Sequence, residues 1–503
     1  MILIGTSVIM NNKINKSNKN NNKYPKEIFK AYDIRGIVET QLTPDVVCDI
    51  GKVLGTLAKE VNAIGMVVGY DGRLTSPELA KRLIEGILSA NCDVYDIGEV
   101  TTPMVYFANR ELKTFSGVMI TGSHNPPEYN GLKIVINDET LTSAKIQEIL
   151  SRLENGDYTD NSININTNIN TLVDINDVDN NIHNDVNSGN KSNDKSTSVA
   201  VHHKHDITDV YIDKIISDVK LKRQMSIVVD CGNGVAGKIA PKLYRRMGAK
   251  VLGLFCDVDG TFPNHHPDPS QPQNLVDLTK ALATTDTEIG LAFDGDGDRL
   301  GVVTKDGNIV YPDRQMMLFV ADVLEKQPGA KIIYDVKSSR LLGDWIVEHG
   351  GEPILCRTGH SFIKAKIKET GALLAGEMSG HIFFNDRWFG ADDGVYAGAR
   401  LLEILSQVDD VSALLNALPN SIATPEINIK VAEGAQHEII AKLQKSAKFP
   451  GSENIITIDG LRVEYKGGFG LVRASNTTPV LVLRFEADSE SYYLKYKNNS
   501  VKF

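Results

Sequence analysis

The chain has 503 residues, of which 42% are hydrophobic and 23% charged, and its net charge is −10. This length exceeds what one hydrophobic core supports and suggests three or four domains of about 150 residues. The acidic balance and the lack of a Lys/Arg run argue against a nucleic-acid-binding surface. No apolar run approaches the ~20 residues of a membrane span, so we expect no membrane association. Five cysteines without a C-x-x-C pair suit a reducing cytoplasm, where we expect the protein.

Two segments have compositions that cannot form a packed core. Residues 1–23 begin with an apolar stretch that lacks the features of a signal peptide, and we expect a disordered N-terminal extension. Residues 155–205 form an Asn-rich, low-complexity insertion that we also expect to be disordered or loosely ordered. Its end contains His202, His203 and His205, which we interpret as the polar edge of a linker because no acidic or cysteine partner stands at metal-ligand spacing.

Outside these segments one pattern occurs three times: a strand that ends in Asp, a turn, and an amphipathic helix. The strands cover residues 65–71, 226–230 and 331–335. A second strand follows each after about 25 residues, which is normal βαβ spacing. The pattern predicts an α/β protein with three tandem repeated domains that contain mixed sheets, at residues 24–154, 206–308 and 309–422. After about Ala423 the pattern stops, and residues 423–503 are expected to form a smaller α+β domain.

A third strand in each repeat ends in an unusual loop, at residues 121–125, 294–298 and 376–381. Ligands in open α/β sheets bind beyond the carboxyl ends of the strands. We therefore expect the three loops to meet at one central cleft.

The first loop belongs to Thr121-Gly-Ser-His-Asn-Pro-Pro127, which puts an exposed serine, Ser123, directly after an apolar strand. No Gly-x-Ser-x-Gly elbow surrounds it, so a hydrolase is disfavoured. Phosphoryl transfer with a covalent serine carrier is the better hypothesis.

The second loop carries Asp294, Asp296 and Asp298 in alternation with glycines. Three carboxylates so close together repel one another unless a cation compensates them. Oxygen ligands of this kind suit Mg²⁺. An EF-hand is excluded, because Arg299 and Lys305 stand where that loop needs Gly and Glu.

Gly232, Gly234 and Gly237 match a dinucleotide-binding fingerprint that follows a strand and opens a helix. The equivalent turns of the other two repeats are not glycine-rich, so we favour a structural tight turn. An NAD-dependent oxidoreductase nevertheless stays an open alternative.

Two further loops carry polar groups that suit a sugar phosphate. Residues 473–478 combine a guanidinium with hydroxyls and backbone N–H groups. In the third repeat Glu377 and Ser379 are candidates for binding sugar hydroxyls, and His381 for moving a proton.

Together these motifs resemble the α-D-phosphohexomutase family, and within it the bacterial phosphomannomutase/phosphoglucomutase branch. The resemblance runs from about residue 24 to about residue 488, apart from the insertion. It implies that Ser123 is carried as phosphoserine, with Mg²⁺ held by its phosphoryl oxygens and by Asp294, Asp296 and Asp298. The expected reaction interconverts the 1- and 6-phosphates of mannose and glucose through a hexose 1,6-bisphosphate, with glucose 1,6-bisphosphate as activator.

The resemblance also implies roles for other residues of the cleft. Glu377 and Ser379 would bind sugar O3 and O4. Arg299 and His360 match further substrate positions, while proton transfer or charge balance would fall to Arg35, Lys133 and His381, which the sequence does not rank. The non-reacting phosphate would be held by a larger set, namely Tyr32, Lys337, Arg473, Ser475, Asn476 and Thr477.

The chain departs from the family pattern in its tail, residues 489–503, which lacks the usual long final helix; this departure could loosen the last domain. A phosphoglucosamine mutase is the nearest rival, but its sugar loop usually has Gln where Met378 stands. A non-catalytic sugar-phosphate-binding protein is the other rival. The sequence does not set the oligomeric state, and we take a monomer as the working expectation.

Overall fold

The computed structural model describes residues 23–161, 199–432, 434–476 and 478–492. Nearly all of the expected N-terminal extension, most of the expected insertion, Thr477 and the end of the C-terminal tail lie outside the described residues.

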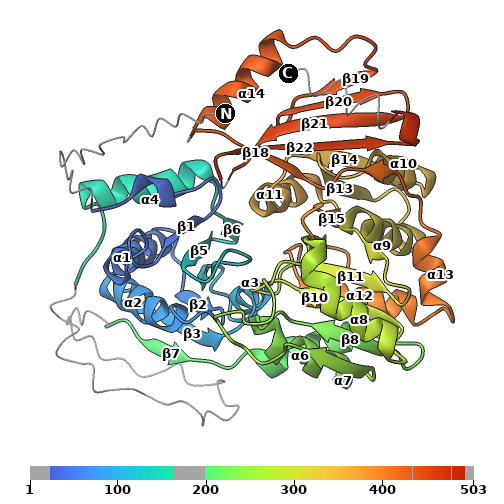
Figure 1. Cartoon of the computed structure of the whole chain (residues 1–503). Helices are drawn as coiled ribbons and strands as arrows, with labels where there is room; N and C mark the ends of the chain where they lie inside the picture. Colours follow the sequence, from blue (N-terminus) through green and yellow to red (C-terminus); the bar gives the residue numbers. More distant parts are fainter. Residues whose placement is uncertain (1–22, 162–198, 433, 477, 493–503) are drawn as a thin grey trace, which may run out of the picture.

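The described residues form four sheets, three mixed and one antiparallel. Each sheet belongs to one domain, and we number the domains I to IV in chain order. Figure 1 shows domain I on the left, domains II and III on the right and domain IV across the top, so that the four follow one another around the middle of the molecule. The predicted fold class is confirmed. The expected residue boundaries between the domains stay predictions.

Domains I to III repeat one strand arrangement. The first strand is central and runs parallel to the second and third, and the fourth is antiparallel to the third. The strands are β2 (Met66–Tyr70), β3 (Val94–Glu99), β4 (Gly117–Ile120) and β5 (Tyr129–Ile136) in domain I; β8 (Ser226–Asp230), β9 (Lys250–Leu254), β10 (Ile289–Phe293) and β11 (Leu300–Thr304) in domain II; β13 (Lys331–Asp335), β14 (Glu352–Cys356), β15 (Leu374–Gly376) and β16 (Ile382–Phe384) in domain III.

Domain I adds edge strands to this arrangement and packs two long helices together. At the start of the first long helix the Thr43 hydroxyl accepts the Val46 N–H and proline occupies N1, as helix starts favour. A Cβ on Gly86 would lie 2.0 Å from the carbonyl oxygen of Cys48, so the close contact of the two helices requires glycine there. The additional elements are η1 (Lys26–Ile28), β1 (Ile34–Ile37), α1 (Pro44–Glu60), α2 (Ser76–Ser89), α3 (Thr102–Glu111), β6 (Glu139–Thr140) and α4 (Ser143–Asn155).

One hydrophobic core runs through domains I, II and III. The ring of Phe107 in domain I lies 5.5 Å from that of Tyr211 in domain II and 6.0 Å from that of Trp388 in domain III. Because protein interiors are close-packed, this shared core fixes the three domains relative to one another. The remaining elements of domains II and III are α6 (Thr208–Asp218), η2 (Val235–Lys238), α7 (Ala240–Arg246), η3 (Pro272–Leu275), α8 (Val276–Thr284), β12 (Ile309–Val310), α9 (Pro312–Lys326), α10 (Arg340–Glu348), α11 (His360–Thr370), α12 (Gly394–Leu405) and α13 (Val411–Asn416).

Domain IV has an antiparallel sheet with one helix against it (Figure 1). A small separate cluster of Val336, Phe469 and Leu471 joins it to domain III. Arg462 also crosses this boundary and donates to the carbonyl oxygens of Val336 and Ser338. The elements are β17 (Ile422–Ala423), β18 (Ile427–Lys430), α14 (Ala435–Ser446), β19 (Asn454–Ile456), β20 (Leu461–Tyr465), β21 (Gly468–Ala474) and β22 (Val480–Ala487).

The end of the Asn-rich insertion differs from the expectation. Instead of a loosely ordered linker, β7 (His202–Lys204) pairs in parallel with β3 at the edge of the domain I sheet. His202 lies 3.2 Å from Asp96, and His203 stacks on Tyr95 with ring centroids 4.8 Å apart. The unpaired edge of β3 supplies backbone partners that composition does not reveal.

No helix among the described residues has the length and apolar character needed to cross a membrane.

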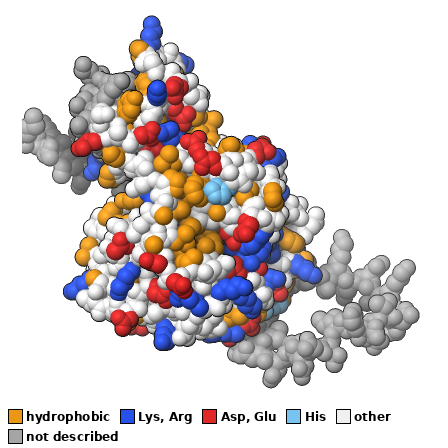
Figure 2. Space-filling model, turned by 90° about the vertical axis from the view of Figure 1, so that its right-hand side faces the viewer, with side chains coloured by type: hydrophobic (Ala, Val, Ile, Leu, Met, Phe, Trp, Pro, Cys, Tyr) orange, Lys and Arg blue, Asp and Glu red, His pale blue; other side chains and the backbone are white. Residues whose placement is uncertain are grey.

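On the side of the molecule shown in Figure 2, acidic and basic side chains are interspersed around a band of hydrophobic groups. All five cysteines are free thiols.

Candidate active site

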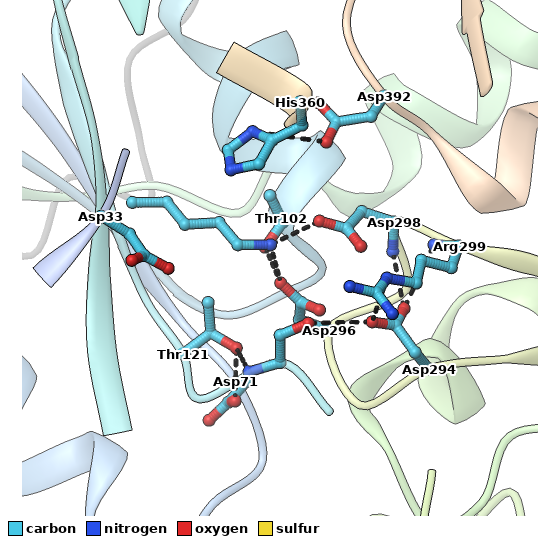
Figure 3. A network of polar contacts seen from close by, with 12 residues as sticks. Asp33, Asp71, Thr102, Thr121, Asp294, Asp296, Asp298, Arg299, His360 and Asp392 are labelled. Atoms are coloured by element: carbon cyan, nitrogen blue, oxygen red, sulfur yellow. Dashed lines mark hydrogen bonds and ion pairs between the residues drawn. The ribbon is translucent and has the colours of Figure 1, made fainter. Parts of the chain in front are cut away.

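The loops that follow β4, β10 and β15 come together at the centre of the molecule. The Ser123 hydroxyl of the first loop donates to Asp294 Oδ2 of the second at 3.0 Å. His381 Nδ1 of the third lies 3.5 Å from Asp298 Oδ1. Figure 3 shows part of this polar network, with Thr121 of the first loop, the three aspartates of the second, and His360 and Asp392 from domain III. The three loops thus meet as the sheet topology predicts.

Ser123 is buried, with 2% of its surface exposed, so the expectation of an exposed serine was wrong. The loop of residues 294–298 in domain II, which we call the metal loop, covers Ser123. A Cβ on Gly295 would lie 2.5 Å from the Ser123 carbonyl oxygen. Its φ is 49°, in the left-handed region, which costs a non-glycine residue about 1–2 kcal/mol. The Ser123 N–H donates to Thr121 Oγ1 at 2.7 Å, and the Thr121 hydroxyl donates to Asp71 Oδ2 at 2.7 Å.

The three aspartates of the second loop are fully buried. Asp294 Oδ1 accepts the N–H groups of Asp298 and Arg299, which bends the loop back on itself. Their ligand atoms lie within 4.8 Å of one another. Oδ1 of Asp296 and Oδ1 of Asp298 have no hydrogen-bond partner among the described residues. Buried carboxylate oxygens without partners fit a hard divalent cation such as Mg²⁺.

Two residues of domain I contact Asp296. Lys133, on β5, donates from Nζ to Asp296 Oδ2 at 2.6 Å and also pairs with Asp298. Thr102, at the start of α3, donates its hydroxyl to Asp296 Oδ2 and its N–H to the Asp296 carbonyl oxygen. These bonds fix the metal loop against the rigid core of domain I.

The carboxylates and Lys133 are electrostatically unequal. Burial and the neighbouring charges of Asp298 and Asp296 hold the pKa of Asp294 well above its usual value. For Asp296 burial acts in the same direction, but the Lys133 ammonium outweighs it and lowers the pKa. Burial alone would lower the pKa of Lys133, but the charges of Asp296 and Asp298 outweigh burial and raise it. Lys133 therefore stays protonated at neutral pH.

His381 lies between an arginine and a carboxylate. Its Nε2 accepts from Arg299 Nε at 3.1 Å, and its Nδ1 lies 3.2 Å from Asp392 Oδ2. This arrangement places the ring proton of neutral His381 on Nδ1. His360 stacks on His381 at 5.7 Å, and burial holds its pKa well below the usual value.

Arg35 and Tyr32 approach the site from domain I. Arg35 donates to Asn125 Oδ1 at 2.6 Å and to Asp33 Oδ2 at 2.5 Å. Tyr32 makes an edge contact with His360 at 5.1 Å, and burial raises its pKa to about 12. Arg35 thus stands close to the serine loop, residues 121–127, and Tyr32 close to domain III.

Glu377 and Ser379 lie in the sugar loop of domain III. Glu377 is buried and accepts the N–H of Gly359, and burial raises its pKa. Its backbone N–H donates to the His381 carbonyl oxygen at 2.9 Å, which closes a tight turn with Gly380 at a φ of 100°. Ser379 is half-buried in this turn.

The phosphate loop, residues 473–478, begins at the end of β21 in domain IV and faces domain III. Arg473 donates from Nε to Asp459 at 2.9 Å, while its buried Nη2 has no partner among the described residues. Asn476 donates to the Thr358 carbonyl oxygen at 3.4 Å. Lys337 of domain III donates to Glu426 of domain IV at 2.7 Å. Ser475 bonds with Thr478 inside the loop, and Thr477 lies outside the described residues.

The glycines of the dinucleotide fingerprint pack against backbone. A Cβ on Gly234 would lie 2.9 Å from the Gly295 carbonyl oxygen, and one on Gly237 would lie 2.0 Å from that of Cys256. The neighbouring Val235 N–H donates to the Gly295 carbonyl oxygen at 3.2 Å. Backbone thus fills the space next to these glycines, which favours the structural tight turn over a pyrophosphate site.

Several residues of the site were not predicted: Asp71, Thr102, Thr121, Lys364 and Asp392. Thr121 directly follows the buried strand β4, a position that could have identified it as a candidate. Asp392 accepts from Lys364 at 3.0 Å and faces both His360 and His381. Nothing in its local pattern indicates this role.

Four family models match the chain in order: phosphoglucomutase/phosphomannomutase alpha/beta/alpha domain I at residues 26–160, domain II at 209–307, domain III at 311–422, and the C-terminal domain at 426–499. The chain belongs to the phosphoglucomutase/phosphomannomutase family. The predicted family is thereby confirmed.

Relatives of this family match over nearly the whole chain. A phosphoglucomutase of Neisseria gonorrhoeae is 53% identical over 94% of this chain and 95% of its own length. A phosphomannomutase/phosphoglucomutase of Pseudomonas aeruginosa is 50% identical over 93% of both chains. The crystal structure of a phosphoglucomutase/phosphomannomutase family protein from Burkholderia thailandensis has 46% identity and a TM-score of 0.84, over 95% of this chain and 97% of the other.

Proposed function

We propose that this phosphohexomutase interconverts the 1- and 6-phosphates of mannose and glucose, with Ser123 as the phosphoryl carrier. The observation that carries the proposal is the hydrogen bond of the Ser123 hydroxyl to Asp294, the first of three buried carboxylates. A phosphoryl group on Ser123 Oγ would bring its oxygens next to these carboxylates. Asp294, Asp296 and Asp298 would hold Mg²⁺ together with a phosphoryl oxygen, and the ion would supply the charge neutralisation that phosphoryl transfer requires.

The transfer exchanges one P–O bond for another. The bond between phosphorus and Ser123 Oγ breaks, and a bond forms to the free hydroxyl oxygen of the hexose phosphate. The product is a hexose 1,6-bisphosphate, whose other phosphoryl group returns to Ser123 after the sugar has turned over in the site. Glucose 1,6-bisphosphate is the proposed activator because it phosphorylates Ser123 directly.

The sugar hydroxyl must lose a proton during the transfer, and His381 is the proposed acceptor. Arg35 is a guanidinium that does not deprotonate in proteins, and the ion pairs of Lys133 keep it protonated. His381 Nε2 accepts from Arg299 Nε, so the neutral ring has its proton on Nδ1, toward Asp392. Its Nε2 becomes available to the hydroxyl when Arg299 turns to a substrate phosphate.

The proposed binding roles follow from the groups that face the site. Arg473 presents a buried, unpaired Nη2, in the part of the chain that the structure describes, and Lys337 is anchored beside it by Glu426. With Tyr32, Ser475, Asn476 and Thr477 they would hold the non-reacting phosphate. Glu377 and Ser379 would bind O3 and O4 of the sugar. No residue is assigned to O2, so mannose and glucose, which differ at C2, would both bind. The free thiols suit the cytoplasm as the proposed location, and we propose that the enzyme acts as a monomer.

The first experiment measures interconversion of both sugar phosphates with Mg²⁺ and catalytic glucose 1,6-bisphosphate. We expect the wild-type enzyme to turn over both sugars, and Ser123→Ala to lose about 10⁴-fold or more in kcat because no carrier remains. Ser217→Ala, which removes an exposed hydroxyl on α6, is the matched control and should retain full activity.

Other outcomes separate the rival functions. Turnover of glucosamine 1-phosphate in preference to both hexose phosphates would identify a phosphoglucosamine mutase. Substrate binding without turnover by the folded wild-type protein would identify a binding protein, and NAD binding without a phosphoryl group on Ser123 would identify an oxidoreductase.

A further inference from the structure

Arg73 lies just after β2 and is 1% exposed, although the proposed mechanism gives it no role. All three nitrogens of its guanidinium group are hydrogen-bonded. Nε donates to Asp71 Oδ2 at 3.2 Å. The two terminal nitrogens donate to four backbone carbonyl oxygens, those of Ser123 (2.7 Å), Asn125 (2.7 Å) and Pro126 (2.7 Å) in the serine loop and that of Tyr129 (3.0 Å) at the start of β5.

We propose that Arg73 is a positioning residue that fixes the direction of Ser123 Oγ for phosphoryl transfer. This inference rests on the proposed function and assigns a new residue to it. Arg73 does not touch the reacting atoms. It acts through the backbone, because the carbonyl group that it binds belongs to Ser123 itself.

The two peptide groups of Ser123 are held by one shared set of partners. Thr121 Oγ1 accepts the Ser123 N–H at 2.7 Å, and Arg73 Nη2 donates to the Ser123 carbonyl oxygen at 2.7 Å. Asp71 connects these two partners, since it accepts both the Thr121 hydroxyl and Arg73 Nε. Holding a peptide at both ends is what a left-handed serine at a φ of 49° requires.

The other two repeats show that this arrangement is particular to the serine loop. The residue two positions after the strand-ending aspartate is Arg73 in domain I, Gly232 in domain II and Lys337 in domain III. Gly232 has no side chain to reach a loop, and Lys337 donates to Glu426 of domain IV instead. If the arginine served only the common sheet, the same position would carry it in all three domains.

Arginine suits this role better than lysine. A guanidinium offers five donors in a fixed plane, whereas an ammonium offers three from a flexible stem. The guanidinium also lies against Gly122, where a Cβ would come within 2.5 Å of Arg73 Cζ. Gly122→Ala therefore displaces the guanidinium without removing any polar group, and provides an independent test.

The experiment compares Arg73→Ala, Arg73→Lys and Gly122→Ala with the wild-type enzyme. Because a misplacement of about 1 Å can cost about 10²-fold, we expect kcat to fall about 10²-fold in Arg73→Ala while KM for the hexose phosphate changes less than about 3-fold. Guanidinium ion at millimolar concentration should restore part of this kcat, and sodium ion should not. Arg73→Lys should recover less than 10% of the wild-type kcat, and Gly122→Ala should lower kcat with KM unchanged. Arg82→Met, a partly exposed arginine on α2 that pairs with Asp45 and Glu85, is the control and should retain full activity.

The outcomes distinguish this inference from the proposed function. An inactive wild-type enzyme would overturn the proposed function and this inference with it. With an active wild type, an unchanged kcat in Arg73→Ala, or a loss that guanidinium ion does not restore in folded protein, would overturn this inference alone. If Arg73→Ala does not fold, Gly122→Ala decides: a lowered kcat supports the positioning role, and a wild-type kcat removes it.

Discussion

The metal loop at residues 294–298 and the phosphate loop at residues 473–478 both gather polar groups, but the rest of the molecule holds them very differently. Asp294, Asp296 and Asp298 are fully buried and take bonds or ion pairs from domains I and III. The core behind them runs unbroken through three domains. The metal loop is therefore preorganised before any ligand binds.

The phosphate loop has weaker connections to its surroundings. Asn476 reaches domain III through one bond of 3.4 Å, and Lys337 pairs with Glu426, whose side chain is 39% exposed. Among the described residues, a small cluster joins the hydrophobic side chains of domain IV to those of domain III. The shared core of domains I to III does not extend into domain IV, so a hinge motion would cost less at this boundary than between the first three domains.

The contrast matches what the proposed reaction demands of each end. Phosphoryl transfer requires charges fixed in place. The sugar must bind in two orientations while the same phosphate loop holds its non-reacting phosphate. This requires some adjustment of the phosphate loop. We therefore expect changes in the metal loop to act on kcat and changes in the phosphate loop to act on KM.

The largest expected effect comes from Asp296→Asn, which keeps the shape of the side chain and removes its charge. Because the carboxylate is buried and pairs with Lys133, kcat should fall about 10³-fold with little change in KM. Binding of Mn²⁺ as a Mg²⁺ substitute should weaken in parallel, which gives a readout that does not depend on turnover.

Asp286→Asn, at an exposed position in the same domain, is the control for Asp296→Asn. It should leave both kcat and Mn²⁺ binding at wild-type values. Wild-type Mn²⁺ binding in Asp296→Asn would mean that this carboxylate is not a metal ligand.

A smaller effect is expected for Arg473→Lys in the phosphate loop. The substitution keeps the charge but loses the planar donors, of which Nε is already used by Asp459. KM should rise about 10-fold, equivalent to about 1.4 kcal/mol, with kcat within about 3-fold of wild type. Steady-state kinetics for both sugars, with the exposed Arg246→Lys as control, measures this split. A fall in kcat at constant KM would place Arg473 in the chemical step instead.

The sequence predicts the three α/β domains and the position of the metal loop because the three repeats carry local signals. Strands that end in Asp, helices at βαβ spacing and loops rich in Gly, Ser and Asp all lie within short windows, and their order predicts three α/β domains and the meeting of three loops. The buried state of Ser123 is different, since the covering loop comes from another domain.

The connections that fix the metal loop could not be predicted for the same reason. Thr102 and Asp296 are 194 positions apart, and Arg73 is 50 positions from Ser123. The first contact follows from how domains I and II pack and the second from how domain I folds, and neither the threonine nor the arginine gives a local sign of its partner. β7 also escaped prediction, because its polar residues gain their order from the free edge of β3.

The smallest expected effect concerns Glu426→Gln, which neutralises the partner of Lys337 across the boundary of domains III and IV. Half-exposed ion pairs contribute only about 0.2–1 kcal/mol, so KM should rise about 1.4- to 5-fold while kcat stays unchanged. Domain IV would still close on the substrate, because Arg462 and the Phe469 cluster hold the boundary independently of this pair.

The double variant Glu426→Gln with Arg473→Lys separates two explanations of that small effect. If Glu426 acts by holding Lys337 against the same phosphate that Arg473 binds, the two free-energy changes should not add, because residues that share one ligand are coupled. If Glu426 only ties domain IV to domain III, the changes should add. A fall in kcat for Glu426→Gln alone would contradict the division between a preorganised metal loop and an adjustable phosphate loop, since the Lys337–Glu426 pair lies on the side of the site that holds Arg473.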